Sequence, residues 1–206
     1  FTYQLRWYHG FLRPYDGEPF FIDRGDEMKA ENEVRVLDVD VDSFLSLLKE
    51  NGATYVDTYF QQRYVYDLKP KQTGKWLRLR TNGKEATLTI KHIESLNIDG
   101  TKELEIVVSD FDTTYSILKE LGYQERSYQE NKRIRYLLDG VEIDIDSWPL
   151  IPTFVEFEGD NALAVIEVVK KLGFSDNQIT TLDVDSIYRH YGVDLNKIKN
   201  LCFEEK

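Results

Sequence analysis

Charged and apolar residues alternate along a series of short segments in this chain, and this alternation restricts the possible folds more than any other feature. Successive side chains of a β-strand point to opposite faces, so each segment predicts a strand with one charged and one apolar face. The predicted strands span residues 29–39, 76–80, 87–92, 102–108, 132–138, 141–146 and 154–159. Turn sequences such as "TNGKE" and "LLDGVE" separate neighbouring strands and predict antiparallel hairpins.

Amphipathic helices interrupt this series of strands. Apolar residues recur at helical spacing within residues 41–52, 112–123 and 161–173, and a shorter helix is expected within 182–192. Asp42 and Asp112 are the expected N-caps, and a glycine marks the expected end of each longer helix. Hairpin-connected strands followed by helices in this order indicate an α+β fold.

The charged strand faces have two interpretations. Antiparallel sheets commonly expose one face to water, which would make the charges a solvated surface. The charges are sorted by strand, however, because Arg78 and Arg80 share one strand whereas Glu103 and Glu105 share another. A solvated face gains little from such sorting, since exposed ion pairs contribute only about 0–1 kcal/mol. If the helices cover the apolar faces, the charged faces turn toward one another inside a barrel or groove, and the pattern alone leaves both interpretations open.

Clustered charges of one sign would give an enclosed face a definite chemistry. Carboxylates that repel one another have raised pKa values unless a cation lies among them, and sets of oxygen ligands suit Mg²⁺ or Mn²⁺. Clustered arginine and lysine bind phosphate, which a guanidinium contacts through two parallel hydrogen bonds. Acidic and basic strands around one space therefore point to a metal–polyphosphate site, and an eight-stranded barrel has room for a small ligand.

Composition argues against several classes of function. The 206 residues contain 26 Lys and Arg against 37 Asp and Glu, and the formal net charge of −11 argues against a nucleic-acid or membrane-surface binder. No apolar run reaches the roughly 18–20 residues that span a bilayer. Cys202 is the single cysteine, which favours a reducing, cytoplasmic setting. We expect residues 1–27 to form an aromatic-rich N-terminal extension that packs somewhere, and residues 28–206 to form one domain.

Motifs of other catalytic chemistries are missing from the sequence. His9, His92 and His190 have no metal-ligand spacing, no G-x-x-x-x-G-K phosphate loop occurs, and no Ser-His-Asp arrangement is indicated. Trp148 is expected to pack in the core, with stacking on a nucleobase as the alternative.

The order of the charged motifs resembles one family. "ENEVR" is similar to the E-x-E-x-K signature that opens proteins of the CYTH superfamily, the class IV adenylyl cyclases and thiamine triphosphatases, also called triphosphate tunnel metalloenzymes. The likeness covers about residues 29–192 and continues through "DTYFQQRYVYDL", "LRLR", "TIKH", "KELEI", "NKRIRY" and "IDIDSWPLIPTFVEFEG". It implies a closed eight-stranded antiparallel β-barrel with helices packed outside, whose tunnel holds a triphosphate and one or two Mg²⁺ or Mn²⁺ ions.

The resemblance also implies roles for individual residues. The expected metal ligands are Glu31, Glu33 and Glu156, with Asp146 and Glu158 assisting. The expected triphosphate contacts are Arg63, Arg78, Arg80, Lys91, Arg133 and Arg135. The expected catalytic residues are Arg35, Glu103 and Glu105, of which the two glutamates would orient basic residues, bind a second metal or position water.

Two positions depart from the family pattern. Arg35 stands where the signature has lysine, and an arginine does not easily replace a lysine as a base, although it can hold phosphate. Asn131 stands where many relatives have a second lysine, so one phosphate contact is expected to be missing.

The resemblance implies phosphoryl transfer. A class IV adenylyl cyclase-like reaction, ATP to cyclic AMP and pyrophosphate, is favoured by the "DTYFQQ…LRLR" spacing. The alternatives are hydrolysis of an inorganic, nucleoside or thiamine triphosphate, or a phosphoryl-ligand binding module that has lost catalysis. We expect a monomer or homodimer that acts on a nucleoside triphosphate or inorganic triphosphate, with no nucleic-acid or membrane partner.

Overall fold

The computed structural model describes residues 5–8, 11–14 and 28–204. Its strands are β1 (Leu5–Tyr8), β2 (Phe11–Pro14), β3 (Lys29–Val36), β4 (Thr54–Asp67), β5 (Lys75–Thr81), β6 (Ala86–Ile93), β7 (Thr101–Val108), β8 (Glu125–Leu138), β9 (Val141–Ser147), β10 (Phe154–Gly159), β11 (Ile179–Thr180) and β12 (Asn200–Leu201). Its helices are α1 (Val41–Glu50), α2 (Phe111–Glu120), α3 (Ala162–Lys171), α4 (Val184–His190) and the short 3-10 helix η1 (Leu195–Lys197).

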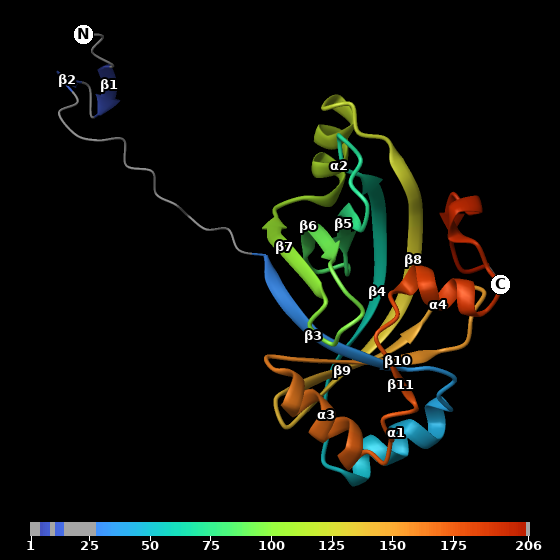
Figure 1. Cartoon of the computed structure of the whole chain (residues 1–206). Coiled ribbons are helices and arrows are strands. Elements are labelled where there is room, and N and C mark those ends of the chain that lie inside the picture. The colour runs from blue at the N-terminus through green and yellow to red at the C-terminus, as the bar shows by residue number, and fades with distance from the viewer. Residues whose placement is uncertain (1–4, 9–10, 15–27, 205–206) are drawn as a thin grey trace.

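Eight strands close into an antiparallel β-barrel (Figure 1). Around the barrel the order is β3, β10, β9, β8, β4, β5, β6 and β7, and β7 pairs with β3 to complete the ring. The short strands β11 and β12 attach to β3 and β8. The structure therefore confirms the expected α+β fold, the closed barrel and the predicted hairpins.

Residues 1–27 contain β1 and β2, which pair with each other, and among the described residues neither pairs with a barrel strand. Only the backbone of these two strands is described within residues 1–27. The expected packing of the aromatic side chains in this segment lies outside the described residues.

The strand β4 is one of the two longest in the barrel, yet its alternation is irregular and the sequence predicted it only as part of a motif. Its register against β8 shifts between Tyr55 and Asp57 and again between Val65 and Tyr66. Such irregularities insert a residue into one strand and break the two-residue period on which strand prediction depends.

The helices cover the apolar faces of the barrel strands. Phe44 of α1 and Val165 of α3 belong to one core cluster with Val34 and Phe157, which lie on β3 and β10. A second cluster joins Leu118 of α2 to apolar residues of β4 and β5, and a third lies under α4. Because these apolar faces point outward to the helices, the charged faces of the same strands point into the barrel. The inward interpretation of the charged faces is thus confirmed.

Helix ends are set by capping residues that differ in part from the predicted ones. Asp40 caps α1 by accepting from the backbone N–H of Ser43 at 2.9 Å, and Asp110 caps α2 in the same way. The prediction of Asp42 and Asp112 as caps was wrong by two residues, because both lie within the first helical turn. Glycines follow the three longer helices with left-handed φ angles of +77° to +84°, as predicted.

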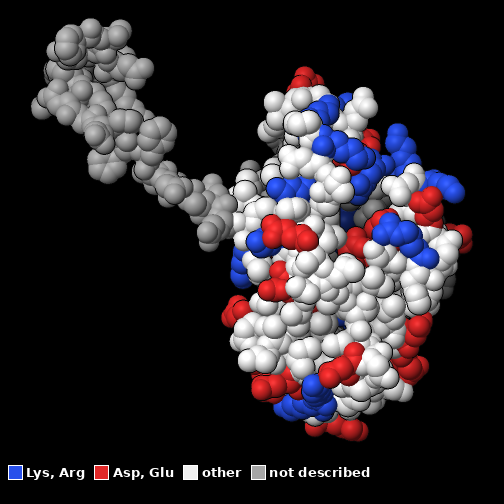
Figure 2. Space-filling view, viewed as in Figure 1, with Lys and Arg blue, Asp and Glu red and all other residues white. Residues whose placement is uncertain are grey.

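On the face shown in Figure 2, Lys and Arg gather over the upper end of the molecule, and the middle of the face is mostly uncharged. Charged residues of the barrel interior such as Glu33 and Arg63 are buried. Among the described residues, none of the helices has the length and apolar character that crossing a membrane requires.

Candidate active site inside the barrel

Every residue predicted for the site occupies an inward-facing position of a barrel strand. These residues are Glu31, Glu33 and Arg35 on β3, Arg63 on β4, Arg78 and Arg80 on β5, Lys91 on β6, Glu103 and Glu105 on β7, Arg133 and Arg135 on β8, Asp146 on β9, and Glu156 and Glu158 on β10. Hydrogen bonds, salt bridges or charge interactions link each of them to another of the set. The structure therefore brings the predicted residues together, and their individual roles remain predictions.

Two glutamates of the predicted metal set lie directly opposite each other. Glu33 of β3 is the register partner of Glu158 of β10, and like charges at directly opposed positions repel. Burial, reinforced by the charges of Glu156, Glu31 and Glu33, raises the pKa of Glu158 to about 8. Within the described chain, no hydrogen bond or salt bridge reaches the Glu158 carboxyl group. This position would be stabilised by a bound cation.

Arg35 joins two of the predicted metal ligands. Its Nε donates to Oε2 of Glu156 at 2.8 Å and its Nη2 donates to Oε2 of Glu33 at 2.9 Å. Its Nη1 donates to the backbone carbonyl of Leu182 at 2.8 Å. Burial acts to lower the pKa of Arg35, but the charges of Glu156 and Glu33 outweigh burial and raise it. Arg35 is therefore a fixed cation between two carboxylates and not a proton acceptor.

Lys91 pairs with a third predicted metal ligand. Its ammonium donates to both carboxylate oxygens of Glu31, at 2.7 and 2.8 Å, and lies 3.6 Å from Glu103. Burial raises the pKa of Glu31 even though Lys91 acts to lower it. A predicted phosphate contact and a predicted metal ligand thus neutralise each other in the free protein.

Two arginines of the predicted triphosphate set also lie directly opposite each other. Arg63 of β4 is the register partner of Arg80 of β5. Burial lowers the pKa of Arg63, and Arg78, Arg80 and Arg133 lower it further. Burial and the charges of Arg78 and Arg133 lower the pKa of Arg80 to about 10. Since both guanidinium groups stay charged near neutral pH, these shifts indicate a strong local attraction for an anion.

The arginine cluster also contains hydrogen-bond donors without acceptors. The Nε atoms of Arg63 and Arg78 are buried and have no hydrogen-bond partner in the described chain. The salt bridge from Arg80 to Glu105 is long, at 3.8 Å. Phosphate oxygens accept such donors, and arginine contacts phosphate through its planar fork.

Polar and aromatic neighbours fix the position of Arg63. Its Nη2 donates to Gln61 at 2.8 Å and to the side-chain oxygen of Asn131. Asn131 in turn donates to Asp146 at 3.0 Å, so this neutral amide links the arginine to a carboxylate. The guanidinium carbon of Arg63 lies 4.5 Å from the centre of the Trp148 ring. Trp148 is 4% exposed, which confirms its expected packing role and leaves this ring face in contact with Arg63.

Arg133 and Arg135 are already paired with acidic residues. Arg133 contacts Asp146 at 2.5 Å, Asp144 at 2.6 Å and Glu156 at 3.2 Å. Burial acts to lower the pKa of Arg133, but these three carboxylates outweigh it. Arg135 contacts Asp144 at 2.6 Å. These two arginines are therefore less available to an incoming phosphate than Arg63 and Arg80.

The two predicted catalytic glutamates differ in their surroundings. Glu105 accepts hydrogen bonds from Thr89 and from Arg78, the latter at 3.2 Å. Burial acts to raise the pKa of Glu105, but Thr89 and the nearby arginines outweigh it and keep the group ionised. One carboxylate oxygen of Glu103, Oε2, is buried without a hydrogen-bond partner in the described chain. Glu103 therefore retains an acceptor that could orient a water molecule or a hydroxyl group.

Sequence reasoning missed Asp144 as a site residue. Its carboxylate is almost fully buried and pairs with both Arg133 and Arg135. The signal was available, because Asp144 and Asp146 are two residues apart on one strand and therefore share a face.

The carboxylates near Glu33 and Glu158 fit a hard divalent cation in their chemistry. Carboxylate oxygens are the donors that Mg²⁺ and Mn²⁺ prefer, and the Glu158 carboxylate has no salt bridge to a described residue. Among the described residues, however, no group of three or more acidic, histidine or cysteine side chains is arranged around a common point at metal-binding distance. Arg35 forms salt bridges with Glu33 and Glu156, and Lys91 forms one with Glu31. A divalent ion could bind near Glu33 and Glu158 only if some of these salt bridges break.

A closed eight-stranded barrel with a charged interior is the fold of the triphosphate tunnel proteins. Sequence comparison assigns the chain to the same group. The CYTH domain model matches residues 29–191, so the chain belongs to the CYTH family. Comparison with curated proteins yields no match.

Several solved structures share the fold. A conserved hypothetical protein from Pyrococcus furiosus is 23% identical, with a TM-score of 0.67 over 77% of this chain and 99% of that one. A "putative adenylate cyclase" from Vibrio parahaemolyticus is 16% identical, with a TM-score of 0.66 over 79% and 99%. The "putative adenylyl cyclase HpAC1" from Hippeastrum, described as having a dominant triphosphatase activity, is 14% identical, with a TM-score of 0.57 over 83% and 100%. At these identities the likeness establishes the fold.

Proposed function

We propose that this protein is a divalent-metal-dependent enzyme that binds a triphosphate inside the barrel and catalyses phosphoryl transfer. One observation carries the proposal: the interior opposes two acidic residues, Glu33 and Glu158, of which Glu158 has no salt bridge to a described residue. It also opposes two basic residues, Arg63 and Arg80, whose one salt bridge among the described residues is the long contact from Arg80 to Glu105. Opposed like charges cost stability unless a ligand of opposite charge neutralises them. A metal–triphosphate complex supplies both the cation and the anion.

The basic and the acidic residues of the site would have different roles. Arg63, Arg78 and Arg80 would bind the phosphate oxygens and neutralise the charge that develops on the leaving group. Glu31, Glu33 and Glu158 would hold Mg²⁺ or Mn²⁺, with Glu156 and Asp146 as further predicted ligands. The ion, when bound, would polarise the phosphoryl oxygens and orient the triphosphate.

Cyclisation of ATP is the first candidate reaction. The ribose 3′-oxygen attacks the α-phosphorus, the bond from that phosphorus to the bridging oxygen breaks, and pyrophosphate leaves. The 3′-hydroxyl proton needs an acceptor, and Glu103 is the candidate. Its Oε2 accepts no hydrogen bond from a described residue and lies 3.6 Å from the Lys91 ammonium and 3.8 Å from Nη2 of Arg78. Arg35 is excluded from this role, because its guanidinium is fixed between Glu33 and Glu156.

Hydrolysis is the second candidate reaction, in which water attacks the terminal phosphorus and orthophosphate is released from a nucleoside, inorganic or thiamine triphosphate. The triphosphatase activity described for the structurally similar Hippeastrum protein favours hydrolysis.

A binding module without catalysis is the third candidate, and the fixed position of Arg35 favours it. In each case we propose a cytoplasmic protein.

Product analysis separates these candidates. The protein is incubated with ATP, inorganic triphosphate or thiamine triphosphate in the presence of Mg²⁺ or Mn²⁺, and the products are resolved by mass. Cyclic AMP with pyrophosphate supports cyclisation, whereas orthophosphate together with the corresponding diphosphate supports hydrolysis. Tight triphosphate binding in calorimetry without any product supports the binding module.

A double variant tests the location of the site. Glu31→Ala combined with Glu33→Ala should abolish metal-dependent turnover. Glu50→Ala combined with Glu167→Ala, which changes two exposed helix residues, should leave turnover unchanged. If the Glu31/Glu33 variant stays fully active, the proposed metal position is wrong.

A further inference from the structure

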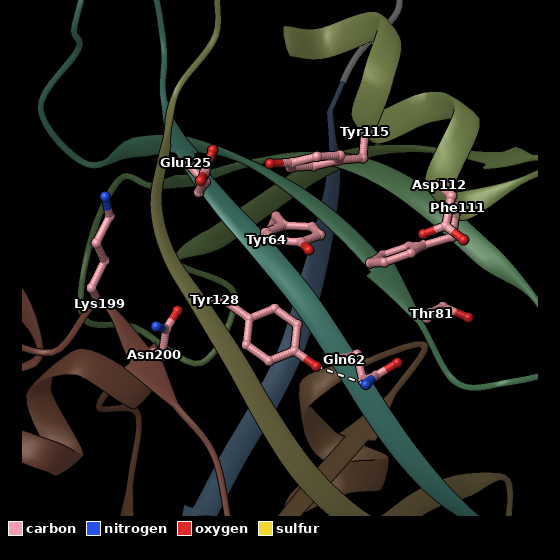
Figure 3. A pocket seen from close by; sticks show the side chains of 10 residues that line it. All are labelled: Gln62, Tyr64, Thr81, Phe111, Asp112, Tyr115, Glu125, Tyr128, Lys199 and Asn200. Atoms are coloured by element: carbon pink, nitrogen blue, oxygen red, sulfur yellow. Dashed lines mark hydrogen bonds between the residues drawn. The ribbon is translucent and has the colours of Figure 1, made fainter.

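The outer wall of the barrel contains a pocket that the interior site does not use. It has a volume of about 620 Å³ and lies between α2, β4, β8 and the segment that ends in β12 (Figure 3). Its lining includes Tyr64, Phe111, Tyr115 and Tyr128. Pockets that bind small organic molecules commonly have volumes of about 300–1,000 Å³ and aromatic walls.

The strand β4 separates this pocket from the barrel interior. Tyr64 lines the pocket, while Arg63, its neighbour in sequence, belongs to the interior arginine cluster. Successive side chains of a strand point to opposite faces, so the two residues serve different sites. A ligand in the pocket would contact none of the residues proposed for the triphosphate.

Three aromatic rings pack around Tyr64, and those of Phe111 and Tyr115 stack on it. The centre of the Tyr64 ring lies 4.4 Å from that of Tyr115, 5.2 Å from that of Tyr128 and 5.6 Å from that of Phe111. The Tyr128 hydroxyl accepts a hydrogen bond from Gln62 at 2.7 Å and donates one to Glu130 at 2.9 Å, which fixes its ring (Figure 3). Aromatic faces carry negative electrostatic potential and attract cations.

Two carboxylates add negative charge to the pocket. Glu125 and Asp112 lie on opposite sides of Tyr64 in the view of Figure 3. Neither carboxylate has a hydrogen bond or salt bridge to any residue that the structure describes. Burial raises the pKa of Tyr64, and the neighbouring Tyr115, Glu125 and Asp112 raise it further. Lys199 also lines the pocket, but it lies beyond the β8 ribbon from Tyr64 in this view and is exposed.

We propose that this pocket binds a small organic ammonium ion that carries apolar substituents. The carboxylates of Asp112 and Glu125 attract its charge, and the rings of Tyr64, Phe111, Tyr115 and Tyr128 contact its hydrocarbon groups. A neutral ligand would lack the charge–charge attraction to the two carboxylates, and an anion would be repelled by them. The proposal is independent of the reaction inside the barrel.

An isosteric pair of probes tests the proposal with the full chain. Choline carries a trimethylammonium group, and 3,3-dimethylbutan-1-ol has the same shape without the charge. Ligand-observed NMR titrations, performed with EDTA present, should show at least about tenfold tighter binding of choline, because cation–π contacts and two carboxylates favour the charged probe. Equal binding of both probes, or no binding of choline, would overturn the proposal.

Variants locate the binding site. Glu125→Gln and Tyr64→Leu should each weaken choline binding about three- to tenfold, since each removes one source of attraction. Glu120→Gln, at an exposed position of α2 outside the pocket, is the matched control and should leave binding unchanged. Glu125→Gln keeps the test decisive if Tyr64→Leu disturbs the packing of α2. Choline binding that Glu125→Gln leaves unchanged, or that inorganic triphosphate displaces, would place choline elsewhere and overturn the proposal.

Discussion

Arg63 and Arg80 face each other across the β4–β5 pair inside the barrel, and the pKa of each is lowered by burial and by neighbouring arginines. This opposition is unfavourable in the free protein and becomes favourable when an anion lies between the two guanidinium groups. Opposed arginines such as these lower the stability of the folded protein and raise its affinity for an anion.

Replacement of Arg80 should therefore separate stability from binding. We predict that Arg80→Met raises the free energy of unfolding by about 0.5–1 kcal/mol, because it removes one of two opposed like charges. The same variant should weaken the binding of inorganic triphosphate about tenfold or more, because it removes a charged donor. Urea unfolding and calorimetric titration measure the two effects. Arg126→Met, at an exposed site on β8, should change neither, and an Arg80→Met variant that binds triphosphate normally would exclude Arg80 from the site.

Arg35 offers a second test, because it occupies carboxylates that were predicted to bind metal. A lysine has a single ammonium group and cannot reproduce the planar contacts to Glu33, Glu156 and the Leu182 carbonyl. We predict that Arg35→Lys binds Mn²⁺ about tenfold more tightly, as measured by electron paramagnetic resonance of free Mn²⁺. Arg189→Lys, on the exposed surface of α4, serves as the control. Unchanged Mn²⁺ affinity in Arg35→Lys would mean that Arg35 does not compete with the ion.

The raised pKa of Glu158 makes stability depend on pH in the metal-free protein. Its folded pKa of about 8 exceeds the ordinary value of 4.5, so the folded state binds more protons between these pH values. The free energy of unfolding contributed by this group therefore falls as the pH rises from 4.5 to about 8. Glu158→Gln removes the titration and should be more stable than the unsubstituted protein by about 1–3 kcal/mol at pH 8.5, with little difference at pH 5.

Urea unfolding in EDTA at the two pH values measures this difference. Glu167→Gln, at an exposed position of α3, should behave like the unsubstituted protein at both. A stability gain of equal size at pH 5 and pH 8.5 would show that Glu158 does not titrate in this range.

The architecture was predictable because it rests on local signals. The alternation of Leu77 and Leu79 with Arg78 and Arg80 predicts a two-faced strand, and the helices require the apolar faces. The helices that end at a glycine were also predictable, because helical spacing of apolar residues and a terminal glycine are local signals. Closure of the eight strands into a barrel came from the family resemblance, since the alternation alone is equally compatible with an open sheet that has one solvated face.

The pairing of charges inside the barrel was not predictable. Arg35 and Glu156 are 121 residues apart, and nothing in the sequence specifies that β3 and β10 pair in the register that also opposes Glu33 to Glu158. Register depends on the tertiary contacts of both strands. The sequence predicted which residues line the interior, whereas only the structure shows which carboxylates are already neutralised and which are not.

Asp144 illustrates that difference. It was missed in the sequence, and the structure shows that it neutralises two arginines and is therefore needed for stability. It neutralises Arg133 and Arg135 at 2.6 Å each from an almost fully buried position. Removal of one partner from a buried ion pair costs about 3–5 kcal/mol, because it leaves an uncompensated charge in the interior. We predict that Asp144→Ala lowers the free energy of unfolding by this amount, and that Asp144→Asn, which retains one acceptor, lowers it by about half as much.

Urea unfolding in the absence of ligand measures the effect of Asp144, with a shift in midpoint and an unchanged slope expected. Asp176→Ala is the matched control, since its exposed salt bridge to Lys170 should contribute less than about 1 kcal/mol. A loss of under about 1 kcal/mol in Asp144→Ala would mean that water or a rearranged carboxylate compensates the two arginines. Added inorganic triphosphate should recover part of the lost stability, because its oxygens can take the place of the missing carboxylate beside Arg133.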